Sequence, residues 1–189
     1  MLIIFKIEFH NCMLSNELIV LRALEPEDLD ILYVWENDTT MWEFGNNIAP
    51  FSHKLLSDYI ANYDGDIYKS QQLRFIIEPV GSDTPVGMVD LYDFDAVNRR
   101  AGVGIMIDAA HQSKGYAQSA LSLLSNYCYR RLGMHQLYAI IADNNKKSIS
   151  AFERSGFFTC GKLRSWIRNG EKYTDALMMQ RLLANIEGT

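Results

Sequence analysis

The segment that most restricts how this chain folds is 104–117, where an apolar strand pattern runs through a glycine-containing turn into a long helical pattern. The first N–H groups of a helix have no partner inside it, and the helix dipole adds partial positive charge at that end. Gly115 lets the backbone approach a ligand closely, and Lys114 adds a charge. We therefore expect a phosphorylated cofactor to bind Gln112, Ser113, Lys114, Gly115, Tyr116 and Ala117.

The length and composition of the chain indicate one folded domain. Its 189 residues are 48% hydrophobic and 22% charged, which is enough apolar material for a buried core. The formal net charge of −5 argues against non-specific binding to nucleic acid and favours cationic substrates. We therefore expect no nucleic-acid partner.

The cysteines and histidines show no spacing typical of a metal site, so no metal is expected. Cys12, Cys128 and Cys160 are odd in number and widely spaced, which favours reduced thiols in the cytoplasm. No apolar run reaches the roughly 18 residues that a membrane-spanning helix needs. The sequence thus predicts a cytoplasmic protein without membrane contact.

The N-terminal segment 1–12 stands apart from the predicted fold. Residues 2–5 are apolar, but the run is too short for a signal peptide and no small-residue cleavage site follows it. Met13 is an alternative to Met1 as the native start. We treat 1–12 as an N-terminal extension and 13–189 as a single domain.

Hydrophobic periodicity and turn signals predict a mixed order of strands and helices. The polar run 37–40 ends the first helix, Asn145 caps the last one, and 169–170 (Asn-Gly) marks a hairpin. The expected strands are 18–22, 73–78, 85–92, 100–108, 137–142, 157–167 and 172–179. The expected helices are 25–36, 52–63, 116–132 and 146–155.

Three segments match the pattern of a known family. Residues 112–117 resemble its pyrophosphate motif, Gln/Arg-x-x-Gly-x-Gly/Ala. Residues 145–157 are similar to its Asn-x-x-Ser segment with a following aromatic residue and Gly-Phe, and 21–28 to its opening strand-to-helix turn. Over residues 17–182 the chain resembles the GNAT superfamily of acetyl-CoA-dependent N-acetyltransferases.

The resemblance implies a fold and a reaction. The fold is α+β, with a central, mostly antiparallel, splayed sheet of about seven strands flanked by about four helices. The reaction moves an acetyl group from acetyl-CoA to an amine by direct attack. Residues 98–101 and 168–173 are most similar to the ribosomal-protein alanine and spermidine N-acetyltransferase types. The alternative is a non-catalytic acyl-CoA-binding protein on the same scaffold.

The resemblance also assigns residues to acetyl-CoA. The pantetheine arm would lie like a strand beside the fourth strand, bound by backbone groups of Ile105 and Ile107. Asn145 would bond near the pantetheine, and Phe152 would pack beside its thiol end. The full set is Ile105, Met106, Ile107, Gln112, Ser113, Lys114, Gly115, Tyr116, Ala117, Asn145, Ser148 and Phe152.

Two positions depart from the family pattern. Phe152 stands where many relatives have a tyrosine that is thought to protonate the leaving thiolate. Gly102 stands where many have a glutamate base. No catalytic residue is therefore assigned from the sequence. The candidate substitutes are Glu36, Asp90, Tyr92 and Tyr173.

The acceptor amine stays open between two classes, and homodimers are common among such relatives. Without a base, an amine of pKa about 10.4 is almost wholly charged at pH 7, whereas an α-amine of pKa about 7.7–8.0 is partly neutral. This difference favours a peptide or protein N-terminus, while the acidic net charge favours a polyamine. Core packing is the alternative for the two tryptophans of the helical segment, and exposure to solvent is the alternative for the two glutamates. The residues expected at the acceptor site are Trp35, Glu36, Trp42, Glu43 and Trp166.

Overall fold

The structure, a computed structural model, describes residues 13–42 and 48–183. The expected extension 1–12 and the candidate residue Glu43 lie outside the described residues. The strands are β1 (Ile19–Arg22), β2 (Leu73–Pro79), β3 (Gly87–Asp95), β4 (Arg100–Ile107), β5 (Gln136–Ala142), β6 (Phe158–Asn169) and β7 (Lys172–Leu182). The helices are α1 (Leu29–Glu36), α2 (Thr39–Trp42), α3 (His53–Ala61), α4 (Ile67–Ser70), α5 (Tyr116–Arg130) and α6 (Lys146–Arg154), with 3-10 turns η1 (Pro26–Asp28) and η2 (Ala109–His111).

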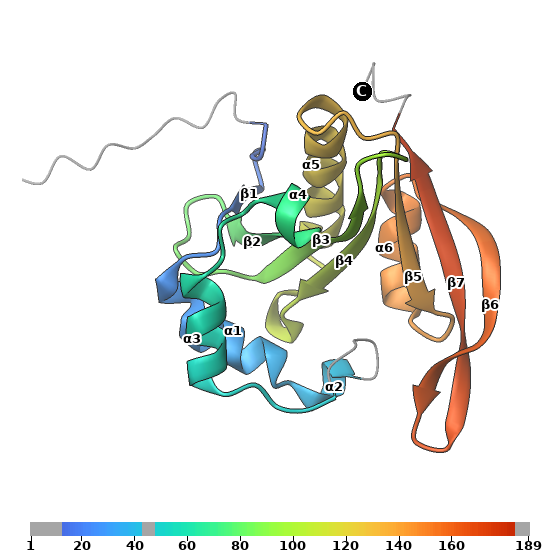
Figure 1. The fold of residues 1–189 in the computed structure, drawn as a ribbon, viewed down its shortest axis with the longest axis horizontal. Helices are drawn as coiled ribbons and strands as arrows, with labels where there is room; N and C mark the ends of the chain where they lie inside the picture. The colour runs from blue at the N-terminus through green and yellow to red at the C-terminus, as the bar shows by residue number, and fades with distance from the viewer. Residues whose placement is uncertain (1–12, 43–47, 184–189) are drawn as a thin grey trace, which may run out of the picture.

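The seven strands form one sheet in the order β1-β2-β3-β4-β5-β7-β6. All neighbours in it are antiparallel except β4 and β5, which are parallel. The expected α+β fold with a mostly antiparallel sheet is confirmed, as is the chain order of the predicted strands and of the four longer helices. Figure 1 shows the long β6–β7 hairpin at the edge of the sheet opposite β1.

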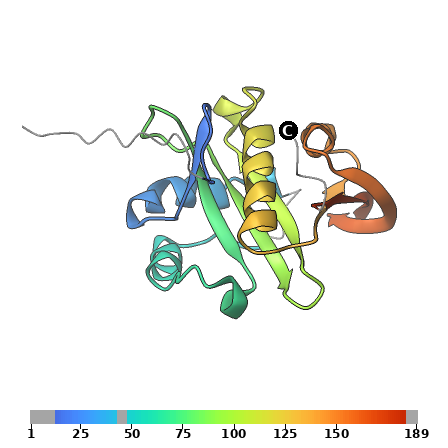
Figure 2. The same cartoon turned by 90° about the horizontal axis from the view of Figure 1, so that it is seen from above.

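Helices cover both faces of the first four strands. On one face, α5 buries Leu121 and Leu124 in the larger core, which also contains Phe152 of α6. On the other face, Leu32 of α1 and Leu56 of α3 lie in a smaller cluster that includes Met88 and Ile76 of the sheet. Figure 2 shows α1 and α3 on one side of these strands and α5 on the other. Burial of each such side chain contributes about 1.5–3 kcal/mol.

The sheet splays open between β4 and β5. These strands pair only from Arg100–Gln136 to Gly102–Tyr138, although β4 continues to Ile107 and β5 to Ala142. Figure 1 shows the two strands diverging beyond the paired end. Each strand therefore has an unpaired edge inside the sheet. This is the splay that the family resemblance predicts.

Two four-residue helices differ from the sequence expectation. The polar run expected only to end α1 also starts α2, because the Asp38 carboxylate accepts a hydrogen bond from the Thr40 N–H (2.9 Å). In the same way, Asp66 caps α4 by accepting from the N–H groups of Tyr68 and Lys69 (3.0 and 3.3 Å). A single carboxylate cap stabilises one helical turn, which is too short to show a hydrophobic period.

Candidate active site

The splay opens into a cleft of about 1220 Å³. Its walls come from α1, α2, the unpaired part of β4, the loop before α5, the end of β5, and α6. The cleft thus lies between the N-terminus of the longest helix and the layer formed by α1 and α2. Its two ends differ in chemistry.

The first end is built around the start of α5. Gly115 is the N-cap of the helix and has a φ of +84°, and Ser113 also has a left-handed φ of +63°. Because the cap residue has no side chain, no side chain bonds to the first N–H groups of α5 from that position. Gly115, Tyr116 and Ala117 all line the cleft. This arrangement can bind a phosphate oxygen through backbone N–H groups and the helix dipole.

The unpaired edge of β4 forms a wall of the cleft. Asp108 N–H donates to Val86 O (2.9 Å), just beyond the paired residues Ile107 and Gly87. Backbone groups in an antiparallel ladder alternate in direction from one residue to the next. The N–H and C=O groups of Ile105 and Ile107 therefore point away from β3, towards the opening. They can hydrogen-bond an extended ligand as a neighbouring strand would.

Side-chain hydrogen bonds link the elements at the end of the cleft built around α5, which we call the cofactor end. Gln112 Nε2 donates to Ile107 O (3.2 Å), and Gln112 Oε1 accepts from Lys147 Nζ (3.1 Å), which links β4 to α6. The expected cap of α6 is confirmed, since Asn145 Oδ1 accepts from the Ser148 N–H (3.1 Å). Phe152 lines the cleft and packs edge-to-face with Phe157.

One predicted cofactor residue does not reach the cleft. Lys114 is exposed and lies outside the lining, because the left-handed turn at Ser113 and Gly115 directs it to solvent. The remaining residues of the predicted cofactor set all line the cleft. Basic side chains at this end come instead from α6, and the sequence prediction missed them. They are Lys146, Lys147 and Arg154.

The second end of the cleft holds a charged cluster. Arg74 donates from Nε and Nη2 to both carboxylate oxygens of Asp90 (2.8 Å each) and from Nη1 to Glu36 Oε1 (2.8 Å). Burial would lower the pKa of Arg74, but the nearby charge and hydrogen bonds of Asp90 outweigh it, so the pKa is raised and the guanidinium stays charged. The three groups together carry one net negative charge at the cleft wall.

Trp35 connects this end to the loop before α5. Its Nε1 donates to Asp108 Oδ2 (3.1 Å), and Asp108 Oδ1 accepts from the Ala110 N–H (2.9 Å). These hydrogen bonds hold the pKa of Asp108 below its usual value, so the carboxylate stays ionised and keeps both partners. Both Trp35 and His111 line the cleft.

The other predicted acceptor residues divide between the cleft and the surface. Trp42 lines the cleft and its Nε1 donates to Glu36 O (3.0 Å). Trp166 does not line it. Trp166 is 57% exposed on β6, the strand at the edge of the sheet opposite β1. Its role in shaping the acceptor site therefore stays a prediction.

Two of the four candidate substitutes for the missing base and acid line the cleft, and the other two do not. Glu36 and Asp90 are the only acidic side chains among the described residues that line the cleft. Tyr173 is exposed on the hairpin, away from the cleft lining. Burial raises the pKa of Tyr92 to about 12, so its phenol is protonated at neutral pH and is not a base.

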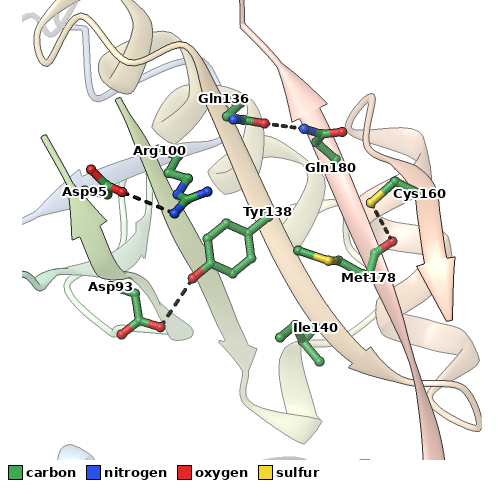
Figure 3. A pocket seen from close by; sticks show the side chains of 9 residues that line it. All are labelled: Asp93, Asp95, Arg100, Gln136, Tyr138, Ile140, Cys160, Met178 and Gln180. Atoms are coloured by element: carbon green, nitrogen blue, oxygen red, sulfur yellow. Dashed lines mark hydrogen bonds and ion pairs between the residues drawn. The ribbon is translucent and has the colours of Figure 1, made fainter. Parts of the chain in front are cut away.

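A second hollow of about 580 Å³ lies on the face of β5 and β7 that α5 and α6 do not cover (Figure 3). Its polar groups are already paired: Asp95 with Arg100 (3.3 Å), and Asp93 with the Tyr138 hydroxyl (3.3 Å). Across 13–42 and 48–183, no three His, Cys, Asp or Glu side chains gather as a metal site requires. Among these same residues, no helix has the length and hydrophobicity to cross a membrane.

The parallel strands β4 and β5 splay beside the N-terminus of α5, which leaves strand edges next to an anion pocket. These features define an acyltransferase that uses a coenzyme A thioester. Residues 19–158 match the acetyltransferase (GNAT) domain family. The chain is 31% identical to spermidine N(1)-acetyltransferase of Escherichia coli K12, over 87% of this chain and 86% of that protein. It is 25% identical to the putative ribosomal N-acetyltransferase YdaF of Bacillus subtilis 168, over 92% and 96% of the two chains.

The fold is also similar to that of a solved acetyltransferase structure. Spermidine N-acetyltransferase from Vibrio cholerae, in complex with CoA and spermine, superposes with a TM-score of 0.78 at 27% identity, over 89% of this chain and 97% of that one. The chain therefore belongs to the GNAT acetyltransferase family. It is an acetyl-CoA-dependent N-acetyltransferase, and the comparisons support this catalytic interpretation over the non-catalytic alternative.

Proposed function

We propose that the acceptor is a polyamine and that the acidic end of the cleft receives it. The observation that carries this proposal is the pair of carboxylates, Glu36 and Asp90, which line the cleft where α1 meets the sheet. Cationic amines are attracted by such a locally negative wall. The relatives named for spermidine and the neighbouring structure that holds spermine support the same acceptor class.

The cofactor end fits acetyl-CoA. The N–H groups at Gly115, Tyr116 and Ala117 would hold the diphosphate, with Lys147 close to them through Gln112. The backbone edge of Ile105 and Ile107 would bind the amides of the pantetheine arm. Acetyl-CoA supplies the acetyl group as a thioester, and the protein contributes by holding both reactants in one cleft.

We propose that a carboxylate at the acidic end of the cleft removes the proton from the amine. Asp90 pairs in register with Gly104 of β4, and Gly104 has no side chain to screen the carboxylate from the cleft. Arg74 keeps Asp90 oriented through two hydrogen bonds. A carboxylate in this place can orient the ammonium group and accept its proton directly or through water. Asp90 thus stands in for the family glutamate that Gly102 replaces.

Asp90→Asn is expected to raise the KM for spermidine by about tenfold, corresponding to about 1.4 kcal/mol, and to lower kcat by about 10²-fold because the proposed base is lost. The reason is that the amide keeps the size of the side chain but removes its negative charge. The affinity for CoA should stay unchanged, because Asp90 is remote from the N-terminus of α5. Steady-state kinetics with spermidine and calorimetry with CoA check both expectations.

Asp95→Asn is the matched control, since Asp95 is on the same strand and pairs with Arg100 outside the cleft. It should leave the KM for spermidine within twofold, or about 0.4 kcal/mol. A panel of acceptors completes the test. A higher kcat/KM for peptides with a free N-terminus than for spermidine contradicts the polyamine proposal and favours the peptide acceptor instead.

Assembly and location are further proposals. We expect a homodimer, which sedimentation velocity measures directly. One Vibrio cholerae structure of spermidine N-acetyltransferase, with a TM-score of 0.72 at 27% identity, is described as dodecameric, so larger assemblies are an outcome to look for. The cytoplasm is the proposed location, from the odd number of widely spaced cysteines.

A further inference from the structure

The cleft passes through the sheet from one face to the other. Successive side chains of a strand point to opposite faces, so Met88 and Asp90 of β3 share a face. Met88 packs in the cluster formed with α1 and α3, which places Asp90 and the acidic end of the cleft on the α1 face. Phe152, at the cofactor end, belongs to the core on the opposite face.

The second hollow lies on the same face as the acidic end. Leu137 and Ala139 of β5 are in the core beside α5, so Tyr138 and Ile140, which alternate with them, point to the α1 face. Ile140 lines both the cleft and the second hollow. The two spaces therefore meet at the Ile140 side chain, on one face of the sheet.

A glycine leaves room between the acidic end and the second hollow. Gly104 of β4 pairs in register with Asp90, and a Cβ built on it would meet only a ring carbon of Tyr92, at 4.0 Å. The Tyr92 ring itself covers Gly102, where a Cβ would lie 2.2 Å from it. An extended ligand can therefore lie across Gly104, beside the edge of the Tyr92 ring.

A β-bulge brings the carboxylate of Asp93 to the second hollow. The register of β3 shifts between Tyr92 and Asp95, and Asp93 has a left-handed φ of +49°. In a regular strand the Asp93 side chain would point away from that of Tyr92, into the core beside α5. Phe94 occupies that core instead, and Asp93 lines the second hollow.

Asp93 keeps one carboxylate oxygen for a ligand. Its Oδ2 accepts a hydrogen bond from the Tyr138 hydroxyl (3.3 Å), as Figure 3 shows, whereas Oδ1 has no donor within the described parts of the chain. Asp95 differs, since its oxygens accept from the Asn98 N–H (2.8 Å) and Nδ2 (2.7 Å) and it pairs with Arg100 (3.3 Å). The acceptor capacity left in the hollow thus belongs to Asp93.

We propose that Asp93 is a specificity-determining residue, which binds the distal ammonium group of a triamine whose reacting amine lies at Asp90. This inference rests on the proposed function, in which a polyamine occupies the acidic end. The two aspartates are three residues apart on β3, roughly 10 Å at the rise of a strand. The terminal nitrogens of extended spermidine are roughly 11 Å apart, from bond lengths of about 1.5 Å, whereas those of putrescine are only roughly 6 Å apart.

The surface between the two carboxylates suits the methylene groups of such a ligand. The rings of Tyr92 and Tyr138 pack edge-to-face there, with centroids 6.0 Å apart. Ile140 and Met178 line the hollow beside Tyr138. Apolar side chains favour contact with methylene groups, and a tyrosine ring attracts a neighbouring ammonium group.

Asp93→Asn tests this contact directly. We expect it to raise the KM for spermidine by about tenfold, because the amide keeps the size of the side chain and removes its charge. The kcat should stay within twofold of wild type, since Asp93 is remote from the amine that reacts. Asp93 is exposed, and asparagine tolerates a left-handed φ as aspartate does, so the variant should unfold at the wild-type temperature.

A second acceptor isolates the distal ammonium group. N-butyl-1,3-diaminopropane has the aminopropyl group of spermidine but carries hydrogen in place of the distal amine. Wild type should therefore have at least tenfold higher kcat/KM for spermidine than for this analogue. In Asp93→Asn this ratio should fall by about tenfold, because only spermidine loses a contact. An equal loss of kcat/KM for both acceptors overturns the proposal.

Asp95→Asn is the matched control, because both oxygens of Asp95 are already bonded. It should leave the ratio between the two acceptors within twofold of wild type, and an equal response of the Asp93 and Asp95 variants overturns the proposal. If wild type acetylates spermidine and Asp93→Asn keeps the wild-type KM, only the distal contact is contradicted. A wild-type protein that does not acetylate spermidine contradicts the proposed function as well.

Discussion

Gly115→Val is expected to raise the Kd for CoA by about 100-fold, or about 2.7 kcal/mol. The residue has a φ of +84°, a conformation that costs a β-branched side chain about 1–3 kcal/mol. Relief of that strain moves the N–H groups that start α5 away from the diphosphate. Loss of one or two hydrogen bonds to a charged group, at about 1.5–3 kcal/mol each, accounts for the expected size of the effect.

The fold itself should survive this substitution. A Cβ at Gly115 meets only Leu18 Cδ2 at 3.7 Å, which is an ordinary contact. Gly133→Val is the matched control, because Gly133 also has a left-handed φ (+62°) with no atom near its Cβ position and lies outside the cleft. Both variants should unfold at similar temperatures, whereas only Gly115→Val should weaken CoA binding in calorimetry. Equal Kd values for these two variants would contradict the anion pocket at α5.

Asp28→Ala should lower the free energy of unfolding by about 1–3 kcal/mol, because the Arg22 guanidinium and the Glu25 N–H lose a buried acceptor. Asp28 is 3% exposed and accepts two hydrogen bonds from Arg22 (2.7 and 2.8 Å) and one from the Glu25 N–H (2.9 Å). Its loss leaves Arg22 with Glu78 as its remaining acidic partner (2.6 Å). The turn that starts α1 also loses its cap. Urea unfolding at pH 7 measures the difference.

The effect should depend on pH in a defined direction. Burial would raise the pKa of Asp28, but the hydrogen bonds from Arg22 and the Glu25 backbone outweigh it, so the folded pKa is lowered. The ion pair therefore stabilises the fold above the unfolded pKa of about 3.9, and this stability is lost as the pH falls through the folded pKa. The difference in the free energy of unfolding between wild type and Asp28→Ala should therefore shrink as the pH falls from 5 to 3.

Asp58→Ala is the control for this experiment. Asp58 forms an exposed pair with Lys54 one helical turn away (2.8 Å), and such pairs contribute about 0.3–0.5 kcal/mol. A loss of stability as small as this for Asp28→Ala would show that the Arg22 pair adds little to the fold.

Local signals explain why much of the site was predictable from the sequence. The glycine at 115 and the cap at Asn145 act on residues within one helical turn of themselves, so the sequence places them at helix starts without knowledge of the rest of the chain. Ile105 and Ile107 were predictable through the family pattern, because they precede the glycine turn at a constant spacing. The exposure of Lys114 outside the cleft lining could not be predicted, because the left-handed conformation of Ser113, which lacks a glycine signal, is not visible in the sequence.

The sequence by itself determined the strand-turn-helix around Gly115 and the order of the long elements, since hydrophobic period, caps and turn residues act between near neighbours. Only the tertiary structure decided where β4 and β5 part and which distant side chains meet there. Glu36, Arg74 and Asp90 come together across α1, β2 and β3, and no local preference encodes that contact. Such contacts depend on strand register and on helices packed against both faces of the sheet, which exist only once the whole chain has folded.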